Sequence, residues 1–227
     1  MAIRLDHFSM NVHNHYEAAE RLRAETGFGF YDGGTLGPTS ANKIVPLGGP
    51  GMNYIEIVGT ADPYKWAENH EAHPDEYMYN LVKSGDHFGG MCLRVDSQKE
   101  LEDLAKLRGW TPPHAGGRMR PSGIFLPWMS TPSPSPWSKG LPNVYFWPDM
   151  TTHPSGQPIE PAPHMVRPLG VTWVEVGGTE AEMKEWLGVP LDAIPFKYNG
   201  KGHGLYAIGV KTKNGEVVIR RKSAAEV

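Results

Sequence analysis

The chain has 227 residues, enough to bury a hydrophobic core in one large domain or two small ones. Its 22 Lys and Arg residues nearly balance its 25 Asp and Glu residues, so the net charge of -3 gives no electrostatic reason to expect nucleic acid or an anionic membrane as partner. A single cysteine, Cys92, excludes an intrachain disulfide, and no apolar run approaches the length of a membrane span. We therefore expect a globular protein of the cytoplasm.

Residues 1–60 predict one βαβββ module. An alternating strand is followed by a short amphipathic helix, which ends at Gly27 before an apolar residue. Three strand candidates with Gly and Pro turns between them complete the module, at residues 28–32, 43–47 and 53–58. The polar segment 61–85 then links this module to the next.

The same pattern recurs twice, which predicts a repeat architecture. Residues 86–150 form a second βαβββ module, whose helix at 98–107 ends at Gly109. Residues 151–227 form a shorter βαββ extension packed on the modules. Its helix ends at Gly188, and Lys213-Asn214-Gly215 marks a hairpin between its last two strands.

Strand alternation indicates which side chains share a face. The apolar side chains at positions 8, 10 and 12 should pack on the module's helix, so His7 and Asn11 lie on the opposite, concave face. In the closing strand Ile55 should face the helix, which places Tyr54 and Glu56 on the concave face. An imidazole and a carboxylate therefore meet on one surface.

Two stretches carry a family resemblance: Leu5-Asp6-His7-Phe8, which opens the first module, and Asn53-Tyr54-Ile55-Glu56-Ile57, which closes it. They resemble the vicinal-oxygen-chelate superfamily. The segments 43–47, 118–124 and 142–147, with His153-Pro-Ser-Gly156, narrow the likeness to glyoxalase-like domains over nearly the whole chain. The resemblance implies an α+β fold, in which paired βαβββ modules form a cupped mixed sheet with helices outside and a pocket inside.

In that family, metal ligands come from the first and last strand of each module. The resemblance thus makes His7 and Glu56 the candidate catalytic residues or metal ligands. Their donor atoms suit a divalent Zn, Fe, Mn, Co or Ni ion. Because catalytic sites usually have three protein ligands, His153 is a candidate third. The alternative, a site that contains no metal, is also retained.

The second module departs from this pattern. Its equivalent positions hold Gly90 and Phe146, neither of which is a ligand. Although Asp86-His87 repeats Asp6-His7, its odd offset predicts that His87 points to the other face. The residues that we expect around a substrate are Asn11, Tyr54, Arg94, Arg118, Phe146 and Trp147. An inward Arg suits a carboxylate or enolate on an otherwise apolar molecule.

Three readings of function stay open. The first is an enzyme that acts on a small organic carbonyl or carboxylate compound by lyase- or isomerase-type proton abstraction with enolate stabilisation. The second is a non-catalytic binder of small or drug-like molecules, as in bleomycin-resistance-type proteins. The third, an extradiol dioxygenase, needs a His/His/Glu set that neither module supplies. The resemblance also implies a homodimer.

Overall fold

The computed structural model describes residues 1–36, 40–60, 85–133, 135–138, 144–155, 162–190 and 194–227. The linking segment predicted at 61–85 lies outside the described residues except for Gly85. Within the described parts, each predicted helix and strand is present, with ends that differ by a few residues.

The first two units have the same strand arrangement. The first comprises β1 (Arg4–Asn11), α1 (His15–Thr26), β2 (Tyr31–Leu36), β3 (Ser40–Pro46) and β4 (Tyr54–Thr60). The second comprises β5 (His87–Arg94), α4 (Gln98–Arg108), β6 (His114–Met119), β7 (Phe125–Thr131) and β8 (Val144–Phe146). In each, the first strand pairs in parallel with the last, and the other two follow antiparallel.

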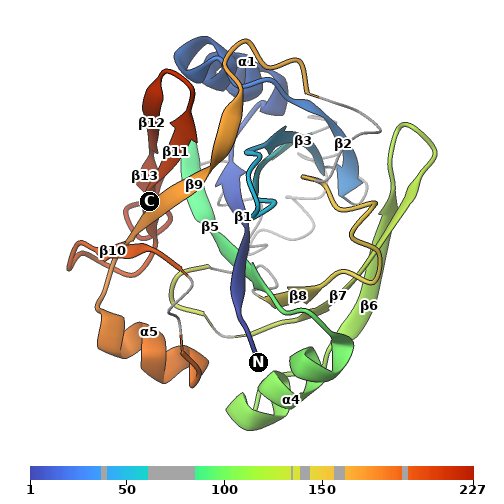
Figure 1. Cartoon of the computed structure of the whole chain (residues 1–227), viewed down its shortest axis with the longest axis vertical. Coiled ribbons are helices and arrows are strands. Elements are labelled where there is room, and N and C mark those ends of the chain that lie inside the picture. The colour runs from blue at the N-terminus through green and yellow to red at the C-terminus, as the bar shows by residue number, and fades with distance from the viewer. Residues whose placement is uncertain (37–39, 61–84, 134, 139–143, 156–161, 191–193) are drawn as a thin grey trace, which may run out of the picture.

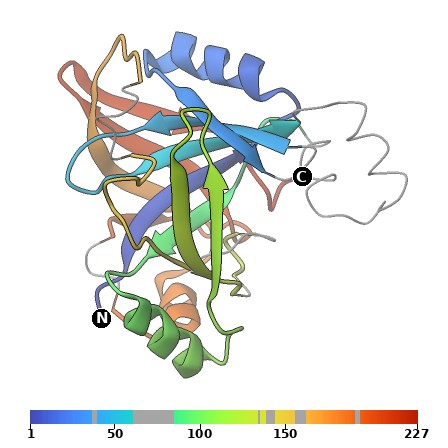
Figure 2. The same cartoon turned by 90° about the vertical axis from the view of Figure 1, so that its right-hand side faces the viewer.

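The two modules join through the antiparallel pair β1–β5, which gives a sheet of order β2-β3-β4-β1-β5-β8-β7-β6. This sheet curls until its edge strands meet, and Figure 2 shows the β6–β7 hairpin lying across β2 and β3. At Gly34, whose φ is 124°, a Cβ atom would lie 3.1 Å from the carbonyl oxygen of Met119. A glycine here therefore lets the cup nearly close.

The third unit comprises β9 (Pro168–Val176), α5 (Glu180–Leu187), β10 (Phe196–Tyr198), β11 (Leu205–Thr212) and β12 (Gly215–Arg220), followed by β13 (Lys222–Ser223). It forms a four-stranded sheet of order β10-β9-β11-β12 (Figure 1). The predicted βαββ pattern missed the three-residue strand β10, which pairs in parallel with β9. So short a strand has no alternation to detect.

All three helices of the described residues end as the sequence predicts. Gly27, Gly109 and Gly188 adopt left-handed φ angles of 75°, 64° and 68° at the C-caps. Glycine reaches this conformation without a Cβ clash, which explains why each helix stops there. None of these helices is long and apolar enough to cross a membrane.

One hydrophobic core connects the three units. The side chains of β1 and β5 that face away from the cup's interior, such as Phe8 and Met91, belong to the same buried cluster as Val174 of β9 and Ile208 of β11. In addition, β13 pairs in parallel with β5. The third unit therefore covers the convex side of the cup, so the concave side is left for a ligand.

Candidate functional site

His7 lies at the centre of the concave face. The strand register places Tyr54 of β4 on one side of it and Cys92 of β5 on the other, while Ser9 pairs with Glu56. The rings of His7 and Tyr54 stack with centroids 4.6 Å apart. The predicted concave orientation of His7, Tyr54 and Glu56 is thus confirmed.

The His7 imidazole and the Glu56 carboxylate face each other. His7 Nε2 lies 3.7 Å from Glu56 Oε2, too far for a hydrogen bond but close enough for one substrate atom to contact both. The Glu56 side chain is 16% exposed and that of His7 only 3%, so the carboxylate is the more accessible partner. Asn42 Nδ2 donates a hydrogen bond to Glu56 Oε1, and Arg118 approaches the same oxygen at 3.9 Å.

The carboxylate of Asp6 is buried beneath His7. Asp6 has no partner across the β1–β5 ladder because it is an extra residue in a β-bulge, and Asn53 Nδ2 donates to its carbonyl oxygen at 3.2 Å. The bulge lets the Asp6 carboxylate reach the side chains of the concave face. It accepts from four donors: His7 Nδ1 (2.6 Å), Trp147 Nε1 (2.9 Å), His153 Nε2 (3.2 Å) and an Arg94 guanidinium nitrogen (3.3 Å).

These contacts set the charges of the cluster. Burial would raise the pKa of Asp6, but His153 and His7 outweigh it and hold that pKa well below its ordinary value. Burial would lower the pKa of His7, yet the neighbouring Cys92 sulfur and the hydrogen bond with Asp6 raise it well above its ordinary value. Because burial also raises the pKa of Cys92, its thiol is neutral near pH 7. Asp6 is therefore the anion that keeps His7 protonated.

His153 differs from His7 in its charge. Burial lowers the pKa of His153 against the attraction of Asp6, so its ring is neutral near pH 7. The backbone N–H of Ser155 donates to Nδ1 at 3.2 Å, which leaves the ring proton on Nε2, the nitrogen that faces Asp6. His153 thus helps to fix the Asp6 carboxylate.

This arrangement predicts an alkaline titration for His7. Its protonation stabilises the fold at pH values below the ordinary histidine pKa of about 6.5, and the contribution is lost as pH rises through the raised folded-state pKa. We expect the His7 ring resonances in an NMR titration to move with a midpoint above 6.5. A His7 midpoint at or below the ordinary histidine value of about 6.5 would contradict the ion pair with Asp6.

Among the predicted substrate-binding residues, the structure corrects one. Phe146 packs with the hydrophobic core, because the pairing of Arg94 with Tyr145 puts Tyr145 on the concave face instead. The Tyr145 ring stacks on Trp147, with centroids 5.6 Å apart and planes 9° apart, and meets His7 edge-on. The sequence alignment of the two closing strands was off by one residue, which reverses every side chain.

Asn11 and Arg94 occupy the predicted face but differ in their contacts. Asn11 is buried, and its Oδ1 accepts from Ser9 Oγ at 3.4 Å. The Arg94 guanidinium lies in the floor of the cup, where it also donates to the carbonyl oxygens of Leu5 (3.0 Å) and Gly51 (2.8 Å). Arg94 therefore compensates the charge of Asp6, and its contact with a substrate stays a prediction.

The expectation for His87 was wrong. His87 pairs with Asn11, so the two share a face of the sheet. A second bulge causes this, because Gly89 has no partner across the ladder and shifts the alternation of β5 by one residue. A Cβ at Gly89 would lie 2.2 Å from Asn11 Nδ2, so a larger residue here would force the Asn11 side chain to move.

Sequence and structure comparisons identify the family. The model of the glyoxalase-like domain matches residues 5–189. The chain belongs to the glyoxalase-like domain family. Among solved structures, it is similar to a hypothetical protein from Staphylococcus aureus, at 11% identity and a TM-score of 0.59, over 99% of this chain and 88% of that one. At this identity the likeness shows the fold alone.

Two further solved structures match with lower TM-scores. A mutant of 4-hydroxymandelate synthase from Streptomyces coelicolor has 14% identity and a TM-score of 0.48, over 97% of this chain and 63% of that one. Methylmalonyl-CoA epimerase from Mycobacterium tuberculosis has 12% identity and a TM-score of 0.37, over 56% and 77% of the two chains. None of the curated proteins matches the chain.

The divalent metal that the glyoxalase-like family implies fits this site poorly. His7 meets part of the requirement, since its Nδ1 is held by a carboxylate and its Nε2 faces Glu56, as in many metal-binding histidines. Yet no three His, Cys, Asp or Glu side chains of the described residues are grouped to hold an ion. His153, the candidate third ligand, uses both ring nitrogens in hydrogen bonds with Asp6 and Ser155. We therefore derive no step through a metal.

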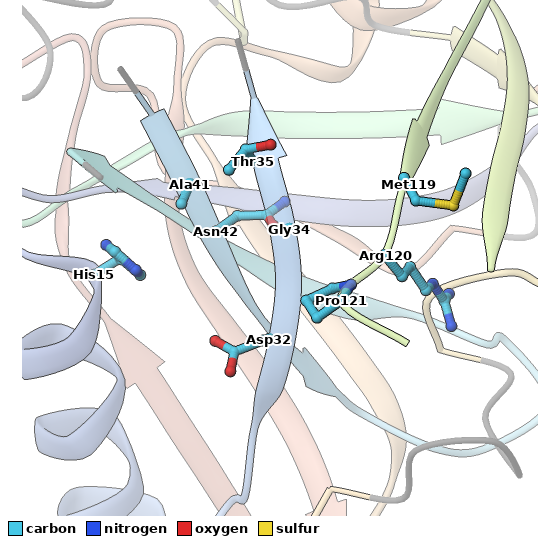
Figure 3. A pocket seen from close by; sticks show the side chains of 9 residues that line it. All are labelled: His15, Asp32, Gly34, Thr35, Ala41, Asn42, Met119, Arg120 and Pro121. Atoms are coloured by element: carbon cyan, nitrogen blue, oxygen red, sulfur yellow. The ribbon is translucent and has the colours of Figure 1, made fainter. Parts of the chain in front are cut away.

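A pocket of about 320 Å³ opens beside the polar cluster of this glyoxalase-like domain. Figure 3 shows that residues of α1, β2 and β3 line one side of it, while Met119, Arg120 and Pro121 at the end of β6 line the other. Asn42 lines the pocket and also donates to Glu56, so it connects the pocket to the cluster. The volume is at the lower end of the range for small-molecule sites.

Proposed function

We propose that the protein is an enzyme that removes a proton from a carbon atom next to a carbonyl or carboxylate group of a small organic substrate. The observation that carries the proposal is the charged pair of His7 and Glu56, whose facing atoms lie 3.7 Å apart on the concave face. A carboxylate base beside a cationic donor suits enolate chemistry, because the base can take the C–H proton while the donor stabilises the carbonyl oxygen.

Glu56 and His7 have different roles because they carry opposite charges. Glu56 takes the proton as the C–H bond breaks, because it is the accessible carboxylate and its orientation is fixed by Asn42. The electron pair of that bond moves onto the carbonyl oxygen, which becomes an enolate. Protonated His7 donates its Nε2 proton toward this oxygen, while Asp6 keeps the ring charged and oriented.

The enolate can then follow two routes. Return of the proton from Glu56 to a different carbon of the delocalised enolate gives an isomerase, whereas expulsion of a leaving group from the neighbouring carbon gives a lyase. Both use the same base and the same oxyanion donor, so the geometry supports the shared first step.

Deuterium exchange tests that shared step without knowledge of the product. The protein is incubated in D₂O with a panel of small keto acids, hydroxyketones and carboxylic acids, and the C–H resonances are followed by NMR. Loss of one C–H signal faster than in buffer, with stereospecific labelling, supports the proposal. A panel in which no compound exchanges faster than in buffer contradicts it.

One observation favours the binder as a second function. Tyr54, Tyr145 and Trp147 form an aromatic wall around His7, and such a wall suits a flat ring. Ring compounds that bind in saturation-transfer NMR and undergo no C–H exchange would support the binder over the enzyme.

A further inference from the structure

Arg118 is a buried cation with incomplete hydrogen bonding. It lies on β6, its side chain is 8% exposed, and Nε and one terminal nitrogen have no hydrogen-bond partner among the described residues. Its ion-pair partner, Glu56 Oε1, lies at 3.9 Å, beyond hydrogen-bond distance. A guanidinium in such surroundings normally has its N–H groups matched by acceptors, so an acceptor is missing.

The charges of the cluster point to an anion as that acceptor. Within the group joined by ion pairs, the cations are His7, Arg94 and Arg118 and the carboxylates are Asp6 and Glu56. Arg120, a further buried cation that lines the pocket, lies outside this group and donates to the carbonyl oxygen of Thr152. One positive charge of the group therefore remains unbalanced. Asp6 and Arg94 satisfy each other in the floor, which leaves the excess at Arg118, on the side of the cup that faces Glu56.

Arg118 is also close to the pocket. A Cβ at Gly34, which lines the pocket, would lie 3.9 Å from Arg118 Cδ, an ordinary van der Waals distance, so the Arg118 side chain packs against the pocket lining. Asn42, on the neighbouring strand, lines the same pocket, and its Oδ1 also lacks a partner among the described residues. Two lining residues therefore connect the pocket to the cluster: Gly34 adjoins the Arg118 side chain, and Asn42 donates a hydrogen bond to Glu56.

We propose that Arg118 binds the carboxylate of the substrate, so that the substrate is a small organic acid. This inference rests on the proposed function, because it concerns the same substrate. Glu56 faces the C–H group of that substrate, and Arg118 would bind its other end. The carboxylate supplies the acceptor that the guanidinium lacks and balances the remaining positive charge. Arginine suits this task because its planar donors match a carboxylate.

The test compares ligands that share one ring and differ in one group: benzoate, benzamide and phenylphosphonate. Affinities are measured by titration calorimetry with wild-type protein, Arg118→Gln, Arg118→Lys and the surface control Arg23→Gln. We expect wild-type protein and the control to bind benzoate at least about tenfold more tightly than benzamide, the loss of one charge-assisted interaction. Arg118→Gln should abolish that preference, and Arg118→Lys should restore part of it.

The other outcomes overturn the proposal. Equal affinity of wild-type protein for benzoate and benzamide, no binding of either, or a preference that survives in Arg118→Gln would exclude a carboxylate site at Arg118. A clear preference for phenylphosphonate would assign the guanidinium to a phosphoryl group instead. Thermal melts of each variant show whether it is folded.

The experiments distinguish a failure of the proton-abstraction proposal from a failure of the carboxylate site at Arg118. If benzoate binding depends on Arg118 but no acid in the D₂O panel exchanges, then proton abstraction is wrong and the carboxylate site stands. If an acid exchanges at the same rate in Arg118→Gln and in wild-type protein, with an unchanged KM, then the carboxylate site is wrong and proton abstraction stands.

Discussion

Replacing Glu56 by Gln is expected to slow substrate C–H exchange by about 10²- to 10⁴-fold, the usual contribution of a general base. The amide keeps the shape of the side chain, and its oxygen can still accept from Asn42 Nδ2. What it loses is the ability to take a proton. The fold should therefore be retained, and thermal melting should show a midpoint close to that of wild-type protein.

The matched control for this variant is Glu17→Gln, on the exposed face of α1, where the Glu17 side chain is 70% exposed. It makes the same chemical change outside the cup and should leave the exchange rate unchanged. Exchange by Glu56→Gln within about threefold of the wild-type rate would show that another group takes the proton.

Asp6→Ala is expected to destabilise the protein by about 3–5 kcal/mol, the usual effect of removing one member of a buried ion pair. The substitution leaves the guanidinium of Arg94 and the imidazolium of His7 buried without their counterion. The pKa of His7 should then fall, because the ring loses the hydrogen bond and the negative charge of Asp6, which both raise that pKa. Denaturant unfolding measures the first effect and an NMR titration the second.

Asp96→Ala is the control for Asp6→Ala. Asp96 pairs with Arg4 at 3.0 Å on the surface, where both side chains are about half exposed. Such pairs contribute about 0–1 kcal/mol. If the two variants have equal stability, or if His7 keeps its raised pKa without Asp6, then Asp6 is not the counterion that organises the site.

The repeat could be predicted from the sequence because its signals are local. An alternating strand, an amphipathic helix and a glycine at its end occur in each unit, and the structure places a left-handed glycine at all three expected positions. The predicted alternation of side chains between the two faces of β1 is also correct from His7 to Asn11, because no bulge interrupts that part of the strand.

The bulges could not be predicted in this way. The bulge at Asp6 brings a carboxylate to the concave face that strict alternation would place on the other side, and the bulge at Gly89 does the same for His87. The repetition of Asp-His-Phe at residues 6–8 and 86–88 was the available signal. Its meaning depends on the pairing of β1 with β5, which lies about eighty residues away in the sequence.

The short strand β8 caused the error at Phe146. Three residues give no alternation of their own, and the register came from an alignment with β4 that was off by one. Tyr145 was therefore missed as the concave aromatic residue. The homodimer requires a second copy of the chain and the metal site requires an ion, so both stay predictions.

The most direct test of the central claim is the exchange rate of the His7→Ala, Glu56→Gln double variant, measured in D₂O on whichever acid wild-type protein exchanges fastest. If the two residues act as one unit, the double variant should be no slower than the slower single variant, because effects within a catalytic unit do not add. We expect its rate to approach that of buffer alone while the fold is retained. Exchange at the wild-type rate in the double variant would contradict the account.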